Sequence, residues 1–409
     1  MNSKKRILVL TLSFGAGHIR AAESVFMELR RQLPEADLLL VDALQHCSFP
    51  FRALYVWTYW AMIRYAPSLW NKFFNARRKR RDEQTAPAWL WRNGCKNVFE
   101  TIQNFQPEMI VACEVGACEI AVIARRTKLT EAKIINIITD FEAEPIWVKP
   151  EISGFAVPNK EVAEQLQKWG ADAERIKICG IPLDESFSRT QDTQKVKVHF
   201  ALDERQIVLL MGGGMGPTRM DFVASRLLER GENLNIIALF GKDKRMGRKL
   251  DKLKDSATVS LNVIGWTDRV AALMQSAAVL ATKPGGVTLS EAAVCGLPIV
   301  FFDAIPGPEV SNAARFVDAG AGSQTTGSEE TAVEILRLVN DKNALSAMVD
   351  HCRKLAHPKA AVDIVRLVLA ELQNPHVIGE YLSTEKSNIP SFWSKLNLRK
   401  RPVVEVEVK

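Results

Sequence analysis

The sequence predicts an α/β protein made of two parallel-sheet domains, and three observations lead to this expectation. The chain has 409 residues, more than one ordinary hydrophobic core holds, so we expect two domains. Short apolar runs alternate with longer amphipathic stretches, which is typical of parallel strands covered by helices on both faces of a sheet. Each half of the chain also begins with an apolar run that leads into a glycine-rich turn.

The apolar runs give the expected order of elements. We expect strands at 7–12, 36–41, 109–113, 134–138 and 154–157, and then at 207–211, 234–240, 259–264, 279–282 and 299–302. Amphipathic periodicity predicts helices between them, among them 21–32, 160–169, 220–230, 269–275 and 288–295. Pro, Gly and polar residues cluster from 179 to 197, so we expect domains at 1–183 and 184–372. The polar stretch 373–409 predicts a poorly ordered basic tail.

Composition and charge exclude several classes of protein. Hydrophobic residues make up 47% and charged residues 25%, which excludes a disordered, collagen-like or disulfide-scaffold chain. The net charge is +7. Residues 51–96 contain ten basic and two acidic residues, so this segment carries the positive excess and the rest of the chain is close to neutral. This basic-aromatic segment (51–96) also holds five of the nine Trp and three of the four Tyr. Its apolar run 53–63 is far shorter than the ~20 residues that span a bilayer.

The cysteines and the N-terminus point to a cytosolic protein. The seven Cys are scattered, and no pair has the spacing of a zinc site, so we expect reduced core thiols. The first apolar run covers only 7–12 and leads into a glycine turn, which predicts a first strand rather than a signal peptide.

The first glycine turn is Ser13-Phe14-Gly15-Ala16-Gly17-His18, between the first strand and the first helix. Glycines here allow a tight turn and the approach of an anionic ligand to the helix N-terminus. The third glycine of a dinucleotide fingerprint is replaced by Arg20, and no Gly-Lys-Ser/Thr follows, which excludes a P-loop. His18 can titrate near neutral pH and act as a general base, with a purely structural role as the alternative. Glu114, after the strand 109–113, is a rival carboxylate base.

Two further turns lie in the second half. The run Gly212-Gly213-Gly214-Met215-Gly216 leaves backbone amides available for phosphate oxygens, unless it is only a flexible loop. At Pro284-Gly285-Gly286 a strand ends, and a helix is expected from about Thr288, whose hydroxyl and neighbouring N–H groups suit a diphosphate. Glu291, one turn further, could accept hydrogen bonds from two ribose hydroxyls, although such a glutamate is often only a capping residue.

These motifs resemble the donor-site signature of GT-B glycosyltransferases, and above all the group of monogalactosyldiacylglycerol synthases and processive diacylglycerol glucosyltransferases. The resemblance covers roughly residues 5 to 370. In the second half it rests on Gly286-Val287-Thr288-Leu289-Ser290-Glu291, Gly296-Leu297-Pro298, and Pro306-Gly307-Pro308-Glu309 with Asn312. In the first half it rests on the His18 turn followed by Ala21-Ala22, on Asp140-Phe141 with Trp147, and on Tyr65-Ala66-Pro67-Ser68-Leu69-Trp70. Two positions depart from the family pattern: Glu144 stands in place of a histidine and Pro308 in place of a glutamine.

The resemblance implies a GT-B fold, with two Rossmann-like domains facing across a cleft, and a role for each matching residue. His18 would be the base, with Gly17 beside it on the acceptor side. The diphosphate would be held by Gly213, Gly214, Gly286, Val287 and Thr288. Glu291 would bind the ribose, Ile264 and its neighbours would frame the uracil, and Glu309 and Asn312 would line the sugar side. We expect inverting transfer of a hexose from a UDP-sugar to a lipid hydroxyl, with diacylglycerol as the acceptor. The sequence has no Asp-x-Asp pair, so we expect neither a metal nor a separate cofactor.

The basic-aromatic segment predicts contact with an anionic membrane surface. Amphipathic aromatic and basic side chains favour the interface between lipid headgroups and acyl chains. The residues expected there are Trp57, Trp60, Trp70, Arg77, Arg78, Lys79, Arg80 and Arg81. A packed helical insertion with a solvated basic loop is the alternative, and no nucleic-acid-binding motif is present. We therefore expect a cytoplasmic enzyme that is peripheral on the inner face of the plasma membrane. The alternative functions are a UDP-N-acetylglucosamine 2-epimerase-like isomerase and a non-catalytic lipid- or nucleotide-binding relative.

Overall fold

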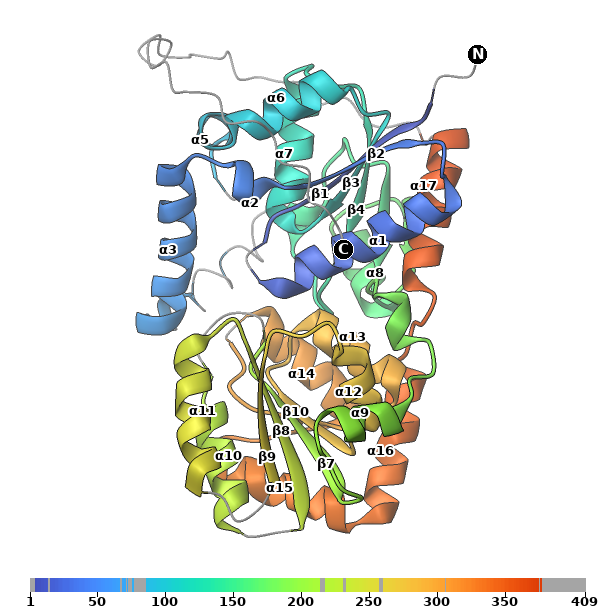
Figure 1. Ribbon diagram of the computed structural model, residues 1–409. Helices are drawn as coiled ribbons and strands as arrows, with labels where there is room; N and C mark the ends of the chain where they lie inside the picture. The colour runs from blue at the N-terminus through green and yellow to red at the C-terminus, as the bar shows by residue number, and fades with distance from the viewer. Residues whose placement is uncertain are drawn as a thin grey trace.

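The computed structural model of the chain shows two α/β domains, one above the other (Figure 1). It describes residues 4–13, 15–66, 68–70, 72, 76, 86–213, 218–230, 233–256, 260–305, 307–374 and 376. The predicted tail therefore lies almost wholly outside the described residues, as do Gly214 and the basic run from Arg77 to Arg81. Each domain contains one six-stranded parallel sheet, which confirms the predicted fold class.

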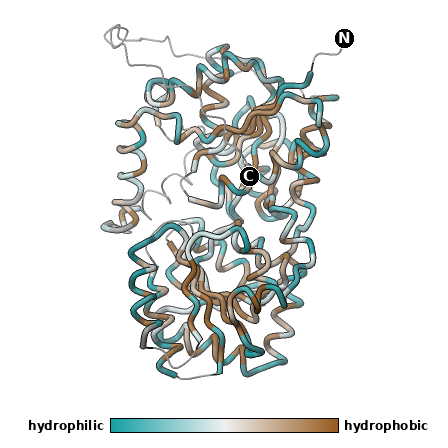
Figure 2. Tube along the Cα trace, in the orientation of Figure 1, coloured by the Kyte–Doolittle hydropathy of each residue, from teal (hydrophilic) through white to brown (hydrophobic). Residues whose placement is uncertain are grey.

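The N-terminal sheet has the strand order β2-β1-β3-β4-β5-β6. Its strands are β1 (Arg6–Thr11), β2 (Asp37–Asp42), β3 (Met109–Cys113), β4 (Lys133–Ile137), β5 (Gly154–Val157) and β6 (Ile176–Ile178). Its helices are α1 (Ala16–Gln32), α2 (Ala43–His46), α3 (Phe49–Tyr65), α5 (Ala88–Gly94), α6 (Lys96–Phe105), α7 (Val115–Arg126) and α8 (Lys160–Lys168). The central strands β1, β3 and β4 are mostly apolar and buried along almost their whole length, as expected for a sheet covered by helices on both faces (Figure 2).

The C-terminal sheet has the order β12-β11-β10-β7-β8-β9. Its strands are β7 (Gln206–Met211), β8 (Leu234–Gly241), β9 (Ser260–Gly265), β10 (Val279–Thr282), β11 (Ile299–Phe301) and β12 (Gly322–Gln324). The helices of this half are α9 (Thr193–His199), α10 (Met220–Glu229), α11 (Lys244–Ser256), α12 (Val270–Ser276), α13 (Gly286–Cys295), α14 (Pro308–Asp318), α15 (Ser328–Asn340), α16 (Lys342–Lys354) and α17 (Ala360–Gln373). All ten predicted strands are present, and among the described residues the two further strands, β6 and β12, are three residues long and were missed.

The last helix crosses back to the N-terminal domain. On α17, Ile364, Val365 and Val368 are fully buried and pack in one cluster with Ile7 and Val9 of β1. Figure 1 shows α17 beside the N-terminal sheet, although the sequence predicted it within the C-terminal domain. The apolar face of an amphipathic helix predicts that it is buried, but not which of two sheets it covers.

The basic-aromatic segment forms α3 and α5 at the side of the N-terminal domain (Figure 1). It divides into an exposed and a buried set of aromatic residues. Trp57 is 70% exposed and Tyr65 79%, whereas Trp70 is 8% exposed and Trp91 is fully buried. Nothing is described of the Trp60 side chain. Among the described residues, no helix has both the length and the apolar character that crossing a bilayer requires.

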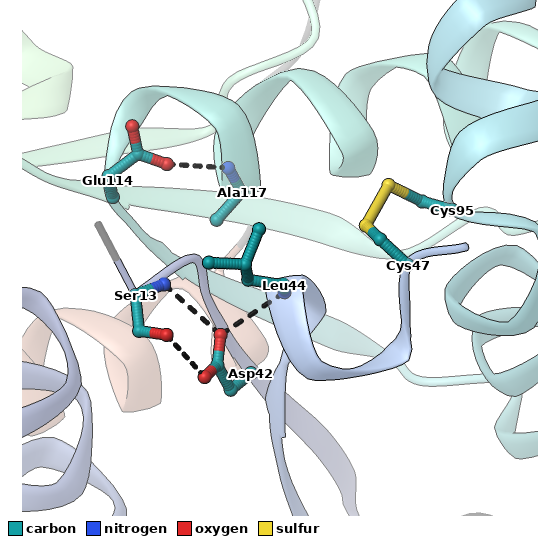
Figure 3. The surroundings of a disulfide bond; sticks show 7 residues. All are labelled: Ser13, Asp42, Leu44, Cys47, Cys95, Glu114 and Ala117. Atoms are coloured by element: carbon teal, nitrogen blue, oxygen red, sulfur yellow. Dashed lines mark hydrogen bonds between the residues drawn. A yellow bond between two sulfur atoms is a disulfide. The ribbon is translucent and has the colours of Figure 1, made fainter. Parts of the chain in front are cut away.

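A disulfide closes the base of this segment. Cys47, at the end of α2, is bonded to Cys95, which precedes α6 (Figure 3). The prediction of seven reduced thiols is therefore wrong for these two residues, because the fold brings together cysteines 48 positions apart. The other five are free thiols, and burial raises the pKa of the partly exposed Cys295 to about 12.

The two domains approach each other closely at the start of α13. A Cβ added to Gly286 would lie 2.2 Å from the carbonyl oxygen of Thr139 in the N-terminal domain. A Cβ on the neighbouring Gly285 would meet no atom within 4 Å. The residue at position 286 must therefore lack a side chain for the domains to pack in this way.

We expect Gly286→Ala to destabilise the protein by about 1–3 kcal/mol, the usual cost of forcing an extra carbon into a packed site. The Thr139 carbonyl is a backbone group and cannot rotate aside as a flexible side chain can. Gly285→Ala, one residue earlier, should stay within about 0.5 kcal/mol of the wild type. Thermal unfolding of the two variants tests this, and equal midpoints would contradict the close approach.

Candidate functional site

The glycine turns of the two domains face each other across one cavity of about 210 Å³. Because the carboxyl ends of parallel strands open into the crevice between domains, ligands of such folds bind there. The described residues that line this first cavity come from the His18 turn, from α3 and its extension, from the loop after β4, and from the loops that precede α13 and α14. They are Gly15, Ala16, Gly17, His18, Tyr59, Trp70, Thr139, Asp140, Gly213, Lys283, Gly285, Gly286, Val287, Thr288, Ile305, Pro308 and Glu309.

The His18 turn is anchored from the second strand. Asp42, at the end of β2, accepts hydrogen bonds from the backbone N–H (3.1 Å) and the hydroxyl (2.6 Å) of Ser13. The same carboxylate accepts the N–H of Leu44 and so caps α2 (Figure 3). One buried carboxylate thus holds the chain just after the first strand and caps the start of α2.

His18 lies in the first turn of α1 and lines the cavity. Its Nδ1 lies 2.9 Å from the hydroxyl oxygen of Thr139. If Nδ1 carries the proton and donates it to Thr139, then Nε2 presents a lone pair to the cavity, as a general base requires. Burial lowers the pKa of His18, and the charge of Asp140 partly opposes this shift. The imidazole is therefore neutral at neutral pH.

The N-terminus of α13 faces His18 from the other domain. Gly286, Val287 and Thr288 form the first turn of this helix, and their N–H groups have no partner within the helix. Gly213, after β7, lines the same cavity with a positive φ of 77°, which glycine tolerates. The structure thus brings these predicted residues and His18 to one cavity, while Gly214 lies outside the described residues.

Lys283 is a site residue that the motif reasoning missed, although it precedes the Pro-Gly-Gly turn directly. It is buried, lines the cavity, and its Nζ lies 3.8 Å from where a Cβ on Gly213 would be. Burial lowers the pKa of this amine, while the carboxylates of Glu309 and Asp303 oppose the shift. The amine of Lys283 therefore lies in the same cavity as the glycine turn at Gly213 and the first turn of α13.

A second cavity, of about 130 Å³, adjoins the first and shares Ala16, Gly17, Gly213, Val287 and Thr288 with it. Trp266 lies on its wall, with Lys242 Nζ 4.6 Å and the guanidinium carbon of Arg20 5.1 Å from the ring centroid. Glu291 also lines it, and burial raises the pKa of this carboxyl to about 8, against the opposing charge of Arg20.

Two predicted donor-site residues have different surroundings. Ile264 is not among the described residues that line either cavity, because it packs against the core of the C-terminal domain. Its neighbours Gly265, Trp266 and Thr267 line the second cavity instead. Asn312 is fully buried beside the first cavity, and its amide is hydrogen-bonded to three groups of the protein.

Glu309 does line the first cavity, at the start of α14. Its Oε2 accepts the backbone N–H of Ile305 at 2.7 Å. Burial raises the pKa of this carboxyl, and the positive charge of Lys283 opposes the shift. Pro308, where the family has glutamine, offers only its ring to the cavity.

Glu114, the rival candidate for the base, caps a helix. It is the N-cap of α7 and accepts the N–H groups of Gly116 (2.6 Å) and Ala117 (3.2 Å), as Figure 3 shows for Ala117. It is not among the described residues that line either cavity. Because its carboxylate already accepts two backbone N–H groups at a helix start, His18 is the better placed base.

The family model described as monogalactosyldiacylglycerol (MGDG) synthase matches residues 18–183. A Staphylococcus carnosus protein named processive diacylglycerol beta-glucosyltransferase is 28% identical, over 93% of this chain and 97% of its own. A Bacillus licheniformis protein of the same name is 25% identical, over 87% and 92%. The predicted family resemblance is confirmed.

Solved structures agree on the fold. Acinetobacter baumannii MurG superposes with a TM-score of 0.58 at 14% identity, over 89% of this chain and 99% of its own. The Staphylococcus aureus MnaA–UDP structure gives 0.60 at 13% identity, over 90% and 97%. The fold is GT-B, as the sequence predicted.

The aromatic wall of the GT-B cleft was not predicted. Tyr59 and Trp70 line the first cavity, with their ring centroids 5.3 Å apart and their planes near perpendicular. The sequence placed Trp70 at the membrane, but it is buried beside the site, whereas Trp57 is exposed as expected. Helical spacing could have suggested the division of α3 into two faces, but nothing in the sequence shows which face meets the cleft.

Among the described residues, no group of three or more His, Cys, Asp or Glu side chains lies close enough to hold a metal ion.

The raised pKa of Glu291 predicts a change of stability with pH. Between its ordinary value and about 8 the folded protein binds a proton that the unfolded chain does not, so the stability from this group falls as pH rises. Glu291→Gln keeps the neutral shape at every pH. We expect its thermal midpoint to match the wild type near pH 5 and to exceed it by about 2–4 °C at pH 9.

A midpoint difference between the Glu291→Gln variant and the wild type that stays constant from pH 5 to pH 9 would contradict the buried, proton-binding carboxyl. Glu330→Gln is the matched control, because this exposed carboxyl has a lowered pKa and its own titration ends below that range.

Proposed function

We propose that this protein transfers a hexose from a UDP-sugar to the hydroxyl of diacylglycerol at the cytoplasmic surface of the membrane. The observation that carries the proposal is that His18 and the N-terminus of α13 line one cavity from opposite domains. The names of the relatives support a diacylglycerol acceptor, and the MnaA–UDP structure supports a UDP-containing donor for this fold.

The proposed reaction is a single displacement. The acceptor hydroxyl gives its proton to Nε2 of His18 as its oxygen bonds to C1 of the sugar, and the bond from C1 to the diphosphate breaks on the opposite side. Attack opposite the leaving group inverts the configuration at C1. Asp140, whose charge favours the protonated imidazole, stabilises the imidazolium that forms.

Negative charge builds on the leaving diphosphate as the bond breaks. The N–H groups of Gly286, Val287 and Thr288 and the ammonium of Lys283 stabilise this charge within a largely buried site. These groups already point at the position where the charge develops, so little reorganisation is needed. In this proposal no metal ion takes part, and transfer persists in excess EDTA.

The second cavity is the proposed nucleoside site. The Trp266 ring offers a flat apolar surface for the uracil, and Glu291 offers its carboxyl group to the ribose hydroxyls. Gly17 lies at the junction of the two cavities, where a side chain would crowd Val287. The diphosphate would then lie between the nucleoside and His18.

The lipid acceptor would reach the cavity from the side of α3. The large apolar side chains exposed on or beside this helix are Phe49, Leu54, Trp57, Tyr65, Leu69 and Trp89. Aromatic side chains of this kind favour the membrane interface, where the neighbouring basic run from Arg77 to Arg81 would add attraction to anionic lipid.

The direct test of function is to incubate the purified protein with mixed liposomes containing diacylglycerol and a panel of UDP-sugars. The lipid product is identified by mass spectrometry. Epimerisation of the sugar nucleotide without an acceptor would favour the isomerase instead. Absence of UDP release with any lipid would favour a binding protein.

We expect His18→Ala to lower kcat by about 10²–10⁴-fold, the usual range for a lost acid–base group. UDP affinity, measured by calorimetry, should change little because His18 is not among the described residues that line the second cavity, the proposed nucleoside site. In the wild type the acid limb of kcat should lie below pH 6.5, since burial lowers the pKa of His18 and only the neutral form accepts a proton. Near-normal turnover in the variant would assign the role of base to another group.

Membrane binding can be tested by liposome co-sedimentation. We expect binding to rise with the fraction of anionic lipid and to weaken when Arg77, Arg78, Lys79, Arg80 and Arg81 are replaced by glutamine, since each cation near the surface contributes about 1 kcal/mol. Trp57→Ser should weaken binding at every lipid composition. Replacing the distant exposed Val198 by serine is the matched control. If binding changes neither with the fraction of anionic lipid nor with replacement of the five basic residues, the proposed membrane contact is wrong.

A further inference from the structure

Asn312 makes three side-chain hydrogen bonds where the two domains meet. It belongs to α14, in the C-terminal half, and is completely buried. Its Oδ1 accepts the backbone N–H of Phe141 at 2.8 Å. Its Nδ2 donates to Oδ1 of Asp140 and to the carbonyl oxygen of Pro284, each at 3.0 Å. One amide thus joins α14, the loop after β4 and the turn before α13.

These bonds use both hydrogens of the amide nitrogen and one acceptor position of the oxygen. Asn312 is also not among the described residues that line the cavity. Asn312 is therefore better placed to hold Asp140, Phe141 and Pro284 in position than to bind a sugar hydroxyl.

The loop that Asn312 holds is the same loop that contacts His18. Thr139, adjacent to Asp140, has its hydroxyl oxygen 2.9 Å from Nδ1 of His18. The Thr139 carbonyl meets Gly286 of the donor helix. Loop 139–141 is therefore fixed between the imidazole and the donor turn, and its position depends on both domains.

We propose that Asn312 is a positioning residue that couples the closure of the two domains to the activation of His18, by holding the Asp140 carboxylate beside the imidazole only when the donor turn is docked. The inference rests on the proposed function, because it assigns His18 the role of base. Asn312 touches no donor atom in this account and acts through Asp140.

Several charged or titratable groups surround His18 and must be considered in any test by pH. Asp140 follows β4, Glu309 lies on α14, Lys283 precedes α13, and Tyr59 lies on α3. Glu309 and Lys283 each favour the charged form of the other. Burial raises the pKa of the Tyr59 phenol, which therefore stays protonated. Asp140 is the group whose charge acts on His18.

The test compares three variants. Asn312→Ser is too short to reach both Asp140 and Pro284, and Asn312→Leu removes all polar atoms at similar volume. Asp140→Asn keeps an acceptor for Asn312 but removes the charge beside His18. Ser311→Ala is the matched control, because the neighbouring Ser311 bonds to Glu142 across the same interface and touches neither Asp140 nor the donor turn.

Two properties are measured for each variant. The first is the kinetics, with kcat and KM for the UDP-sugar taken across pH. The second is the titration of the His18 ring by NMR, assigned among the six histidines with His18→Ala. The NMR titration needs no turnover, so it measures the effect of Asn312 on His18 even if the wild type transfers no hexose. Absence of transfer would contradict the proposed function but not this inference.

We expect Asn312→Ser to lower kcat by about 10–100-fold, the size of effect produced by small misplacements of reacting groups. The affinity for UDP should stay within about threefold. The acid limb of kcat and the NMR pKa of His18 should both move to lower pH, since a displaced Asp140 no longer favours the imidazolium. Asp140→Asn should move them further, and adding Asn312→Ser to it should cause no additional movement. Ser311→Ala should behave as the wild type.

Three results would overturn the proposal. If Asn312→Ser raises KM for the UDP-sugar or changes sugar preference while the His18 pKa stays fixed, Asn312 belongs to the sugar site. If the His18 pKa falls equally in the Asp140→Asn background, the effect does not pass through Asp140. If only the thermal midpoint falls, Asn312 is merely structural. Should Asn312→Leu fail to fold, Asn312→Ser and the Asp140→Asn double variant still decide among these outcomes.

Discussion

The close packing of Gly286 on the carbonyl of Thr139 is the constraint on which the site depends. Each domain alone presents a helix N-terminus at the carboxyl edge of a parallel sheet, which is an ordinary anion site. Only when α13 meets loop 139–141 do His18 and the donor turn share one cavity. The absence of a side chain at position 286 allows this contact, and the hydrogen bonds of Asn312 hold the loop in place.

Burial then sets the charge state of the groups around that contact. It lowers the pKa of His18 and of Lys283 and raises that of Glu291, in each case because the charged form loses hydration. An opposite charge limits the shift at each group: Asp140 at His18, Glu309 at Lys283 and Arg20 at Glu291. The cleft therefore combines an imidazole whose pKa is lowered with a lysine amine whose positive form is favoured by neighbouring carboxylates. That combination suits proton removal on one side and stabilisation of an anion on the other.

The sequence predicted most of the fold because parallel strands buried on both faces have strong apolar runs. The two missed strands are short and lack such a run. Ile176-Lys177-Ile178 has two exposed positions, and Gly322-Ser323-Gln324 has no large apolar residue. Local glycine turns likewise identified His18, Gly286, Thr288 and Glu291. The errors concern contacts between distant segments: the Cys47–Cys95 bond, the return of α17, and the inward-facing side of α3. Such pairings depend on the packing of elements, and no local pattern in a single sequence records them.

The helix α3 shows how one element can serve both the cleft and a surface. Trp57 and Tyr59 are two residues apart, about 200° around a helix, so they point in nearly opposite directions. Tyr59 lines the cavity with Trp70, whereas Trp57 is exposed. The disulfide between Cys47 and Cys95 fixes the base of the segment that carries them (Figure 3). In the proposed reaction the outer face of α3 would meet lipid while its inner face meets the sugar. An acceptor hydroxyl would then travel only the width of one helix, about 10 Å, to leave the membrane interface for the cavity that contains His18.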